Sequence, residues 1–386
     1  MGVDVGEWLN LAIRWLHLTA GIAWIGSSFY FVWLDNHLKP PAEGDASGEL
    51  WSVHGGGFYH NQKYQVAPAA MPERLHWFKW EAYFTWISGF SLLVLIYYVG
   101  AESFLIDPAK ADLSSSAAIA IGLGSLVLGW LVYDGLCRSP VGSSNLALGL
   151  FWFGCLLLAA AALDALFNAR AAYLHVGAIV GTAMVANVFL IIIPNQRKVV
   201  ADLIAGRTPD PRLGAAAKQR SLHNNYMTLP VLFIMISPHY PMTYGAERPW
   251  LVLALLGLTG IAVRHIFNLR GRGRPTGVTI AVAGVLALAT VTYVTLERPS
   301  ASAAPGGDVS FAQVEPILTA RCSGCHTVNR PPRAIALDSF ERIRAASGRI
   351  KAVAVDTHVM PLGNATGMTP EERQRLGAWI AAGSPR

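Results

Sequence analysis

Runs of apolar residues separated by short polar segments fill the first 296 residues of the chain. Each run approaches the roughly 20 residues that a helix needs to cross about 30 Å of hydrocarbon. The pattern predicts an all-α fold: a polytopic membrane helical bundle over residues 1–296, with no cleavable signal peptide. We place about eight spans, near residues 8–34, 77–99, 116–135, 145–164, 171–193, 222–240, 249–268 and 276–296.

Composition and charge agree with a bilayer. Only 14% of the residues are charged, 53% are hydrophobic, and the mean hydropathy is +0.39. Soluble domains carry roughly 25% charged residues. The net charge of +6 does not indicate nucleic-acid binding, because the basic residues lie in short loops, where membrane proteins carry an orientation signal.

The C-terminal part carries the motif Cys322-Ser-Gly-Cys325-His326. This spacing is typical of c-type haem attachment, in which two thiols form thioether bonds and the adjacent imidazole binds the iron. The alternatives are a redox-active cysteine pair followed by a chance histidine, or half of a zinc site. A second cysteine pair of this spacing, needed for a four-cysteine zinc site, does not occur in the sequence.

The motif lies in a small predicted cytochrome c domain, residues 311–386, which follows a flexible linker at residues 297–310 that is rich in Ala, Ser, Pro and Gly. We expect a first helix from Phe311 and a last helix from Pro370, with Phe311 and Trp379 in contact. Met360 is our candidate for the sixth iron ligand, since a thioether raises the haem potential. Met368 and His358 are its rivals.

The motif also predicts the orientation of the chain. Haem c is attached outside the cytoplasm, and an even number of spans places both termini on one side. The loops that would then face the cytoplasm are rich in basic residues, for example Arg197, Lys198 and Arg270, as the positive-inside rule requires. We therefore expect a bacterial inner-membrane protein with both termini and the cytochrome domain in the periplasm.

Histidines inside apolar runs are costly, which favours a functional role. His17 shares a helical stripe with Arg14 and Gly21, and is either a haem ligand or a hydrogen-bonded residue between helices. His17 and His175 belong to the outer half of the predicted bundle. An inner group of histidines could line a site, namely His54, His60, His76, His223 and His265.

The long segment between the first two spans contains the sequence His54-Gly55-Gly56-Gly57-Phe58-Tyr59, followed by Lys63. Three glycines allow the backbone to approach a ligand and point its amides at it. With a histidine, aromatic rings and a cation nearby, the set suits a flat, anionic, polar heterocycle. The alternative interpretation is a glycine-rich turn with ordinary surface residues.

Taken together, the chain resembles the bacterial membrane-bound, cytochrome c-linked urate oxidases over essentially its whole length. The motifs that carry this resemblance are His54-Gly-Gly-Gly-Phe-Tyr59, Lys63-Tyr64, Leu75-His-Trp-Phe-Lys-Trp-Glu81, Ile193-Pro-Asn-Gln-Arg197 and the terminal haem motif. The first span also looks like those of copper-resistance D proteins and membrane protoporphyrinogen oxidases, and members of the latter group hold haem b in a helical bundle.

The resemblance implies two-electron oxidation of urate with addition of water, which gives 5-hydroxyisourate. Electrons would pass to haem c and then to a downstream cytochrome or terminal oxidase, without hydrogen peroxide. For urate, we expect His54 to take protons and Lys63 or Arg197 to hold the negative charge. The other predicted contacts are Gly55, Gly56, Gly57, Phe58, Tyr59 and His223.

A urate site on the inner side would be separated from haem c by about 30 Å of hydrocarbon. This predicts a relay, for which we consider one haem b held by His17 and His175, or by His17 and an inner histidine. Urate could instead bind from the outside, near His17 and His175. Two other functions remain open: a haem b/haem c oxidoreductase acting on a quinol or porphyrin, and a metal permease or sensor with an appended cytochrome.

Overall fold

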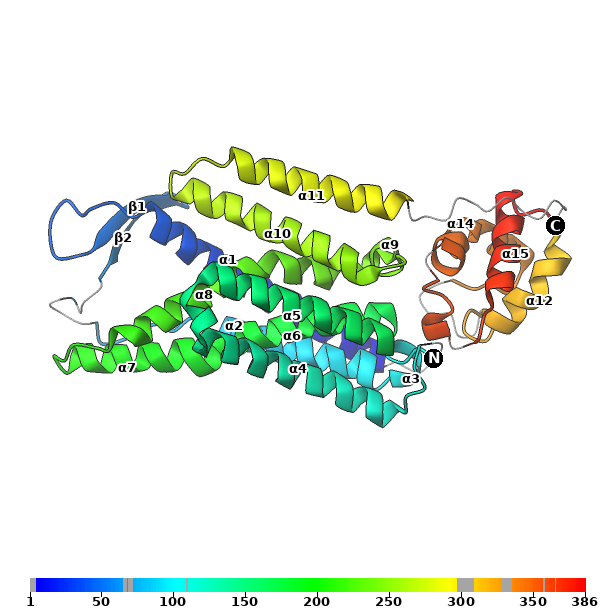
Figure 1. The fold of residues 1–386 in the computed structure, drawn as a ribbon, viewed down its shortest axis with the longest axis horizontal. Coiled ribbons are helices and arrows are strands. Elements are labelled where there is room, and N and C mark those ends of the chain that lie inside the picture. The colour runs from blue at the N-terminus through cyan, green and yellow to red at the C-terminus, as the bar shows by residue number, and fades with distance from the viewer. Residues whose placement is uncertain are drawn as a thin grey trace.

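The computed structural model describes residues 5–64, 68, 72–108, 110–296, 309–327, 335–356, 358–364 and 366–386. It is mostly helical and consists of an N-terminal bundle followed by a smaller C-terminal domain (Figure 1). The helices of the bundle are α1 (Val5–His37), α2 (Trp80–Leu93), α3 (Ala101–Phe104), α4 (Ser115–Arg138), α5 (Asn145–Leu166), α6 (Ala169–Ala186), α7 (Ile193–Ile204), α8 (Pro211–Ile236), α9 (Pro241–Tyr244), α10 (Pro249–Gly271) and α11 (Gly277–Leu296).

Short π- and 3₁₀-helical segments extend several of these helices: η1 (Val94–Tyr98), η2 (Pro140–Ser143), η3 (Asn187–Ile192) and η4 (Ser237–His239). Helix α2 continues into η1, and η3 joins α6 to α7. Side chains that cap the first turn begin several helices, as at Ser114 before α4 and Asp210 before α8. Asp210 and Pro211 explain why α8 begins well before the predicted residue 222, since proline suits the first helical position.

Helices occupy all eight predicted stretches. Five of them are long and apolar enough to cross a membrane: α4, α5, the continuous helix Ala169–Ile204, α10 and α11. Helix α2 has only 14 residues before its π-helical turn, and the first half of α8 is polar. That α1, α2 and α8 also cross a bilayer, which would make about eight spans, stays a prediction.

The structure departs from the all-α prediction at a β-hairpin. Strands β1 (Gly48–His54) and β2 (Gly57–Lys63) pair antiparallel, with His54 opposite Gly57 and Gly48 opposite Lys63. Gly55 and Gly56 form the turn with φ of +58° and +80°. Positive φ at both central residues is the geometry that a two-residue hairpin prefers, and two glycines adopt it without steric cost.

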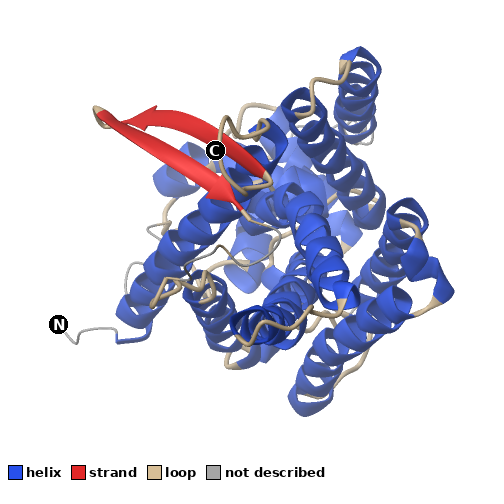
Figure 2. Ribbon diagram, turned by 90° about the vertical axis from the view of Figure 1, so that its left-hand side faces the viewer, coloured by secondary structure: helices blue, strands red, loops and turns tan. Residues whose placement is uncertain are grey.

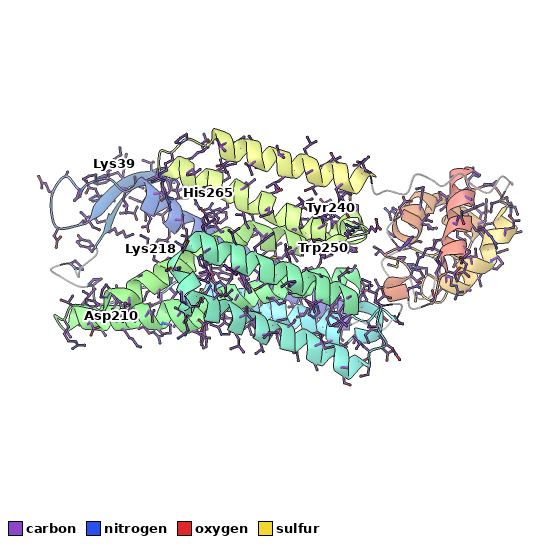
Figure 3. All side chains as sticks on the ribbon, in the orientation of Figure 1. Lys39, Asp210, Lys218, Tyr240, Trp250 and His265 are labelled. Carbon is purple, nitrogen blue, oxygen red and sulfur yellow. The ribbon has the colours of Figure 1, made fainter. Side chains whose placement is uncertain are left out.

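The hairpin and the C-terminal domain lie at opposite ends of the bundle (Figure 1). Viewed along the bundle, the hairpin projects beyond the outline of the helices (Figure 2). We call the two ends of the bundle the hairpin end and the far end. In Figure 3, Lys218 and His265 lie toward the hairpin end, whereas Tyr240 and Trp250 lie toward the far end.

Helix α6 is the centre of the bundle core, with ten buried residues, including Tyr173 and His175. The peripheral helix α11 instead exposes large apolar side chains such as Val278 and Leu288. In a soluble protein such a surface would be unfavourable, whereas lipid accommodates it.

The C-terminal domain contains α12 (Phe311–Arg321), α13 (Phe340–Ala345), α14 (Ser347–Ile350), η6 (Lys351–Asp356), η7 (Leu362–Asn364) and α15 (Pro370–Ala381). Its core is built on Trp379 and Leu376, which are fully buried. Phe311 packs against Trp379 with ring centroids 5.8 Å apart, so the predicted contact between the first and last helices is confirmed. The predicted linker lies outside the described residues, except for its last two.

The C-terminal domain docks on the far end of the bundle. Val359 packs against the apolar core of the bundle, and η7 contacts α3. A cavity of about 1080 Å³ lies between the two parts, and its lining includes Lys110, Asp164, His239, His358 and Arg373.

Candidate functional site

The predicted glycine loop is the turn of the hairpin. A Cβ atom added to Gly55 or Gly56 would meet no heavy atom within 4 Å, so these glycines serve the turn and do not line a close contact. Phe58 is 78% exposed and Tyr59 is 53% exposed, and His54 is exposed as well. These side chains do not converge on a pocket, and the turn accounts for Gly55 and Gly56, whereas Gly57 begins β2.

The charged residues of the hairpin have partners within or beside it. Lys63 Nζ lies 2.7 Å from a carboxylate oxygen of Asp35. His60 lies 2.8 Å from Glu49 and stacks on Trp51 with ring centroids 4.2 Å apart. The pKa of the Glu49 carboxyl is lowered by the backbone N–H of Ala42 and then by His60. The predicted cation is therefore already paired, and Arg197 is exposed on a different element, α7.

A different set of polar side chains comes together inside the bundle, toward the hairpin end. We call it the polar layer: Tyr133, Asp134, Asn145, Asn187, Arg220, His223, Asn224, Asn225, Tyr226, Arg264, His265 and Asn268. It draws on α4, α5, η3, α8 and α10. Buried polar groups are costly unless they are paired, so the partners of each group show how the layer is built.

On one face of α8, the polar layer is held by an ion pair. The Arg220 guanidinium donates to Asp134 at 2.6 Å and to the side-chain oxygen of Asn187 at 3.1 Å. Asn187 in turn donates to Asn224 at 2.8 Å. The Tyr133 hydroxyl lies 2.9 Å from Nδ1 of His223. Asp134 also accepts from the exposed Arg138 at 2.7 Å, so one carboxylate pairs with two arginines and this face of the layer is closely connected.

A second buried arginine of the polar layer, Arg264 on α10, lies against another face of α8. Arg264 Nε donates to the side-chain oxygen of Asn225 at 2.9 Å, and Asn268 donates to the same oxygen at 3.1 Å. The Arg264 guanidinium carbon lies 3.7 Å from the ring centroid of Phe29. Beside it, the Tyr226 hydroxyl lies 2.7 Å from Nδ1 of His265. The structure thus brings His223 and His265 into this layer, while His54 and His60 stay on the hairpin.

Sequence reasoning did not select Arg220 or Arg264 as site residues. A signal was present, because each arginine is followed four residues later by an asparagine, Asn224 and Asn268, and this spacing places both side chains on one helical face. Two such pairs inside or at the end of apolar runs indicate a buried polar surface.

His17 lies between helices α1 and α2. Its Nδ1 is 2.9 Å from the carbonyl oxygen of Thr85, and its Nε2 has no hydrogen-bond partner among the described residues. The glycine that accommodates the ring is Gly89, whose added Cβ would lie 2.8 Å from the ring, rather than Gly21, where it would lie 4.0 Å from Thr85.

His175 is fully buried on α6. Its Nδ1 lies 2.8 Å from the carbonyl oxygen of Ala171, and its Nε2 lies 3.2 Å from the Tyr98 hydroxyl. A Cβ on Gly122 would come within 2.8 Å of the same Nε2. Both nitrogens therefore have partners in close packing, which does not fit an iron held between His17 and His175.

The haem motif follows α12 in the C-terminal domain. Cys322 caps that helix and packs against the domain core, whereas Cys325 is exposed. Burial raises the pKa of the Cys322 thiol to about 11, which is unfavourable for the redox-active cysteine alternative, since reactivity needs a thiolate. His326 Nδ1 lies 3.1 Å from the carbonyl oxygen of Ile335. A hydrogen bond from Nδ1 leaves Nε2 free to bind a metal, so these residues fit haem c attachment.

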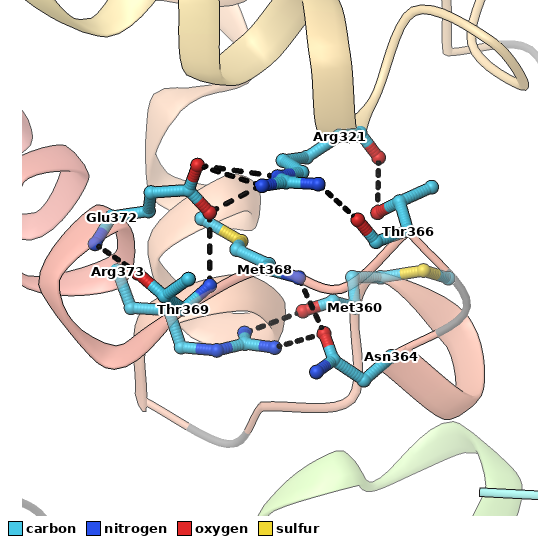
Figure 4. A network of polar contacts seen from close by, with 8 residues as sticks. All are labelled: Arg321, Met360, Asn364, Thr366, Met368, Thr369, Glu372 and Arg373. Carbon is cyan, nitrogen blue, oxygen red and sulfur yellow. Dashed lines mark hydrogen bonds and ion pairs between the residues drawn. The ribbon is translucent and has the colours of Figure 1, made fainter. Parts of the chain in front are cut away.

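Two methionines, Met360 and Met368, lie in or beside the core of the C-terminal domain. Met368 is 3% exposed and belongs to that core, and Met360 packs at its edge. Arg373 donates to the carbonyl oxygen of Met360 at 2.6 Å and to Asn364 at 3.2 Å. In Figure 4, the Met368 side chain lies beside the pair formed by Arg321 and Glu372, and the Met360 side chain points away from it. That Met360 is the sixth iron ligand stays a prediction, with Met368 and His358 as its rivals.

Among the described residues there is no group of three or more His, Cys, Asp or Glu side chains that could hold a metal ion. The profile of the family described as "Urate oxidase N-terminal" matches residues 4–296. The chain belongs to this family. The match covers the bundle and the hairpin, and it ends before the C-terminal domain. Searches of curated proteins and of solved structures found no match.

Proposed function

We propose that this chain oxidises urate by two electrons, with addition of water, to 5-hydroxyisourate. One water is consumed, and two protons and two electrons are released, so no hydrogen peroxide forms. The electrons would pass one at a time to a haem c held by the C-terminal domain, and then to a downstream cytochrome or terminal oxidase. The observation that carries the proposal is a urate oxidase family match over residues 4–296 in a chain that continues into a helical domain with the haem motif.

Haem c, when bound, supplies a one-electron acceptor. Cys322 and Cys325 would hold it covalently, and His326 and Met360 would be its axial ligands. The hydrogen bond between His326 and the Ile335 carbonyl orients the imidazole. Docking through Val359, next to Met360 in the chain, would keep the acceptor close to the bundle.

For urate itself, the polar layer is the better-supported place. Most of its side chains are buried or partly buried, and hydrogen bonds are stronger where water is excluded and the dielectric is low. His223 is the one predicted urate contact that lies there. The earlier candidate base, His54, is the alternative. If a His54→Ala variant oxidised urate at the wild-type rate, His54 would be excluded as the base. If it lost urate oxidation while haem c stayed attached, the hairpin would be supported as the urate site.

A urate site near the hairpin end needs an electron relay to the far end. Because His175 has no available nitrogen, a haem b would be held by His17 and another histidine. Full-length protein with Cys322 and Cys325 both replaced by Ala tests this, because it cannot attach haem c. A remaining b-type absorption band would support the relay. Its absence would favour urate binding in the cavity at the far end, with direct electron transfer to haem c.

The deciding experiment adds urate to oxidised membranes without oxygen and follows the c-type absorption band. We expect the band to appear with urate and not with xanthine. Reduction by a quinol but not by urate would favour the quinol oxidoreductase alternative. Oxygen consumption with peroxide release and no haem reduction would contradict the proposal. We further propose an inner-membrane location with the C-terminal domain in the periplasm, which protease accessibility of that domain in spheroplasts would test.

A further inference from the structure

Arg264 is a buried cation without a carboxylate partner. The residue is only 6% exposed, and among the described residues it makes one hydrogen bond, to the neutral amide oxygen of Asn225. The ion pairs of the described residues do not include it. Its other neighbour is the face of Phe29. A guanidinium carries five N–H donors, so most of these donors have no partner among the described residues.

Asn225 beside it has an unused donor. The residue is fully buried, and its oxygen already accepts from Arg264 and Asn268. Its Nδ2 has no hydrogen-bond partner within the described part of the chain. Leaving a buried donor unpaired is unfavourable, and here it occurs next to an uncompensated positive charge. Both features would be satisfied by an anion that also carries hydrogen-bond acceptors.

The bundle shows that it can neutralise an arginine where structure requires it. Arg220, which is buried to a similar degree, has Asp134 at 2.6 Å. The absence of such a counter-ion at Arg264 is therefore specific to that position. Arg264 lies seven residues before Gly271, the last residue of α10, which places it about 10 Å from the hairpin end.

We propose that Arg264 and Asn225 form the anion-binding end of the urate site. This rests on the proposed function and names the residues that hold its substrate. Urate is a planar anion whose carbonyl oxygens and ring nitrogens accept hydrogen bonds. A planar guanidinium suits such a group, and the free N–H of Asn225 supplies a further donor. Asn268 fixes the Asn225 amide, so that its oxygen faces the arginine and its nitrogen faces the ligand.

The first test replaces Arg264 by Gln in the full chain. We expect the urate concentration for half-maximal haem c reduction to rise about 10- to 100-fold, because a hydrogen bond to a charged group is lost. In the absence of urate, the thermal midpoint should be unchanged or higher, because a buried uncompensated charge is removed. The matched control is Arg270→Gln, which removes an exposed arginine from the same helix and should alter neither quantity.

A second variant, Asn225→Asp, keeps Arg264 and supplies the missing counter-ion. It should raise the thermal midpoint without urate and weaken urate binding at least tenfold. Binding is measured separately from electron transfer as the shift of the thermal midpoint by urate without oxygen. Reduction of haem c by dithionite should be the same in all variants.

Three results are distinguishable. If urate reduces the wild type and both variants with the same half-maximal concentration, the assignment of Arg264 is wrong and the proposed function stands. If urate neither reduces haem c nor shifts the thermal midpoint of the wild type, the proposed function fails and this inference with it. If Arg264→Gln is destabilised without urate and Asn225→Asp binds urate normally, Arg264 has a structural role only.

Discussion

Two faces of one helix, α8, solve the problem of a buried arginine in opposite ways. Arg220 faces Asp134 and Asn187, and its charge is neutralised within the protein. Arg264 approaches the other face through Asn225 and Phe29, and both partners are neutral. The two arginines are buried to a similar degree, so burial alone does not explain the difference.

The difference separates stability from binding. A paired arginine has its desolvation offset by a fixed counter-ion, and breaking the pair is costly. An arginine surrounded by neutral groups keeps its interaction energy available for a ligand. We therefore expect the Arg220 face to control folding and the Arg264 face to control substrate affinity, and the following changes test that division in order of expected effect.

Replacing Asp134 by Ala should produce the largest effect. It leaves the Arg220 guanidinium buried without a carboxylate, beside the Asn187 amide and the rings of Trp130 and Tyr133, which costs about 3–5 kcal/mol. Thermal unfolding in detergent would show this as a clear loss of stability relative to wild type. The matched comparison is Arg264→Gln, which should not destabilise. Equal stability of Asp134→Ala and wild type would mean that Arg220 does not depend on its ion pair, and the contrast between the two faces would disappear.

Removing both members of the pair should have a smaller effect. In Asp134→Ala with Arg220→Met, no charge remains buried at the position of Arg220, and a flexible apolar side chain fills the space. We expect stability within about 1–2 kcal/mol of wild type. A double variant that is as unstable as Asp134→Ala would show that the hydrogen bond from Arg220 to Asn187 matters more than the charge of Arg220.

The difference between local patterns and long-range contacts explains which features could be predicted from the sequence. Apolar runs predicted every long helix of the bundle, because burial in lipid or core depends on local composition. Phe311 and Trp379 were predicted to meet, since the haem motif and a capped last helix define a small domain. The partners of Arg220 and Arg264 come from other helices, at sequence separations of 33 to 86 residues for Arg220 and 39 for Arg264. Such contacts depend on helix packing, which no local pattern contains.

The hairpin shows a different limit. A glycine run that cradles a ligand and a glycine run that turns between strands have the same letters. What distinguishes them is the pairing of Trp51 with His60 and of Val53 with Phe58 across the turn. Alternation of aromatic and β-branched residues around Gly55 and Gly56 was the available signal, and it indicates a hairpin more directly than a binding loop.

The smallest effect is expected from the partly exposed pair of the C-terminal domain, Arg321 and Glu372 (Figure 4). Hydrogen bonds from Arg321 lower the pKa of the Glu372 carboxyl. A lowered pKa in the folded state means that the contribution is present above the unfolded pKa and is lost as pH falls through the folded value. The wild-type domain should therefore lose up to about 1 kcal/mol from about pH 5 downward.

In Glu372→Gln, that acid-dependent part should be missing, and stability at neutral pH should be lower by the same amount. Hydrogen exchange of α12 and α15 peptides in the full chain measures it without interference from the bundle. Asp338→Asn breaks the more exposed pair with Arg342 and should show no measurable change. If Glu372→Gln kept the wild-type dependence of stability on pH, another carboxyl would be responsible. The partly exposed pair of Arg321 and Glu372 would then contribute too little stability to measure, in contrast to the buried pair of Arg220 and Asp134.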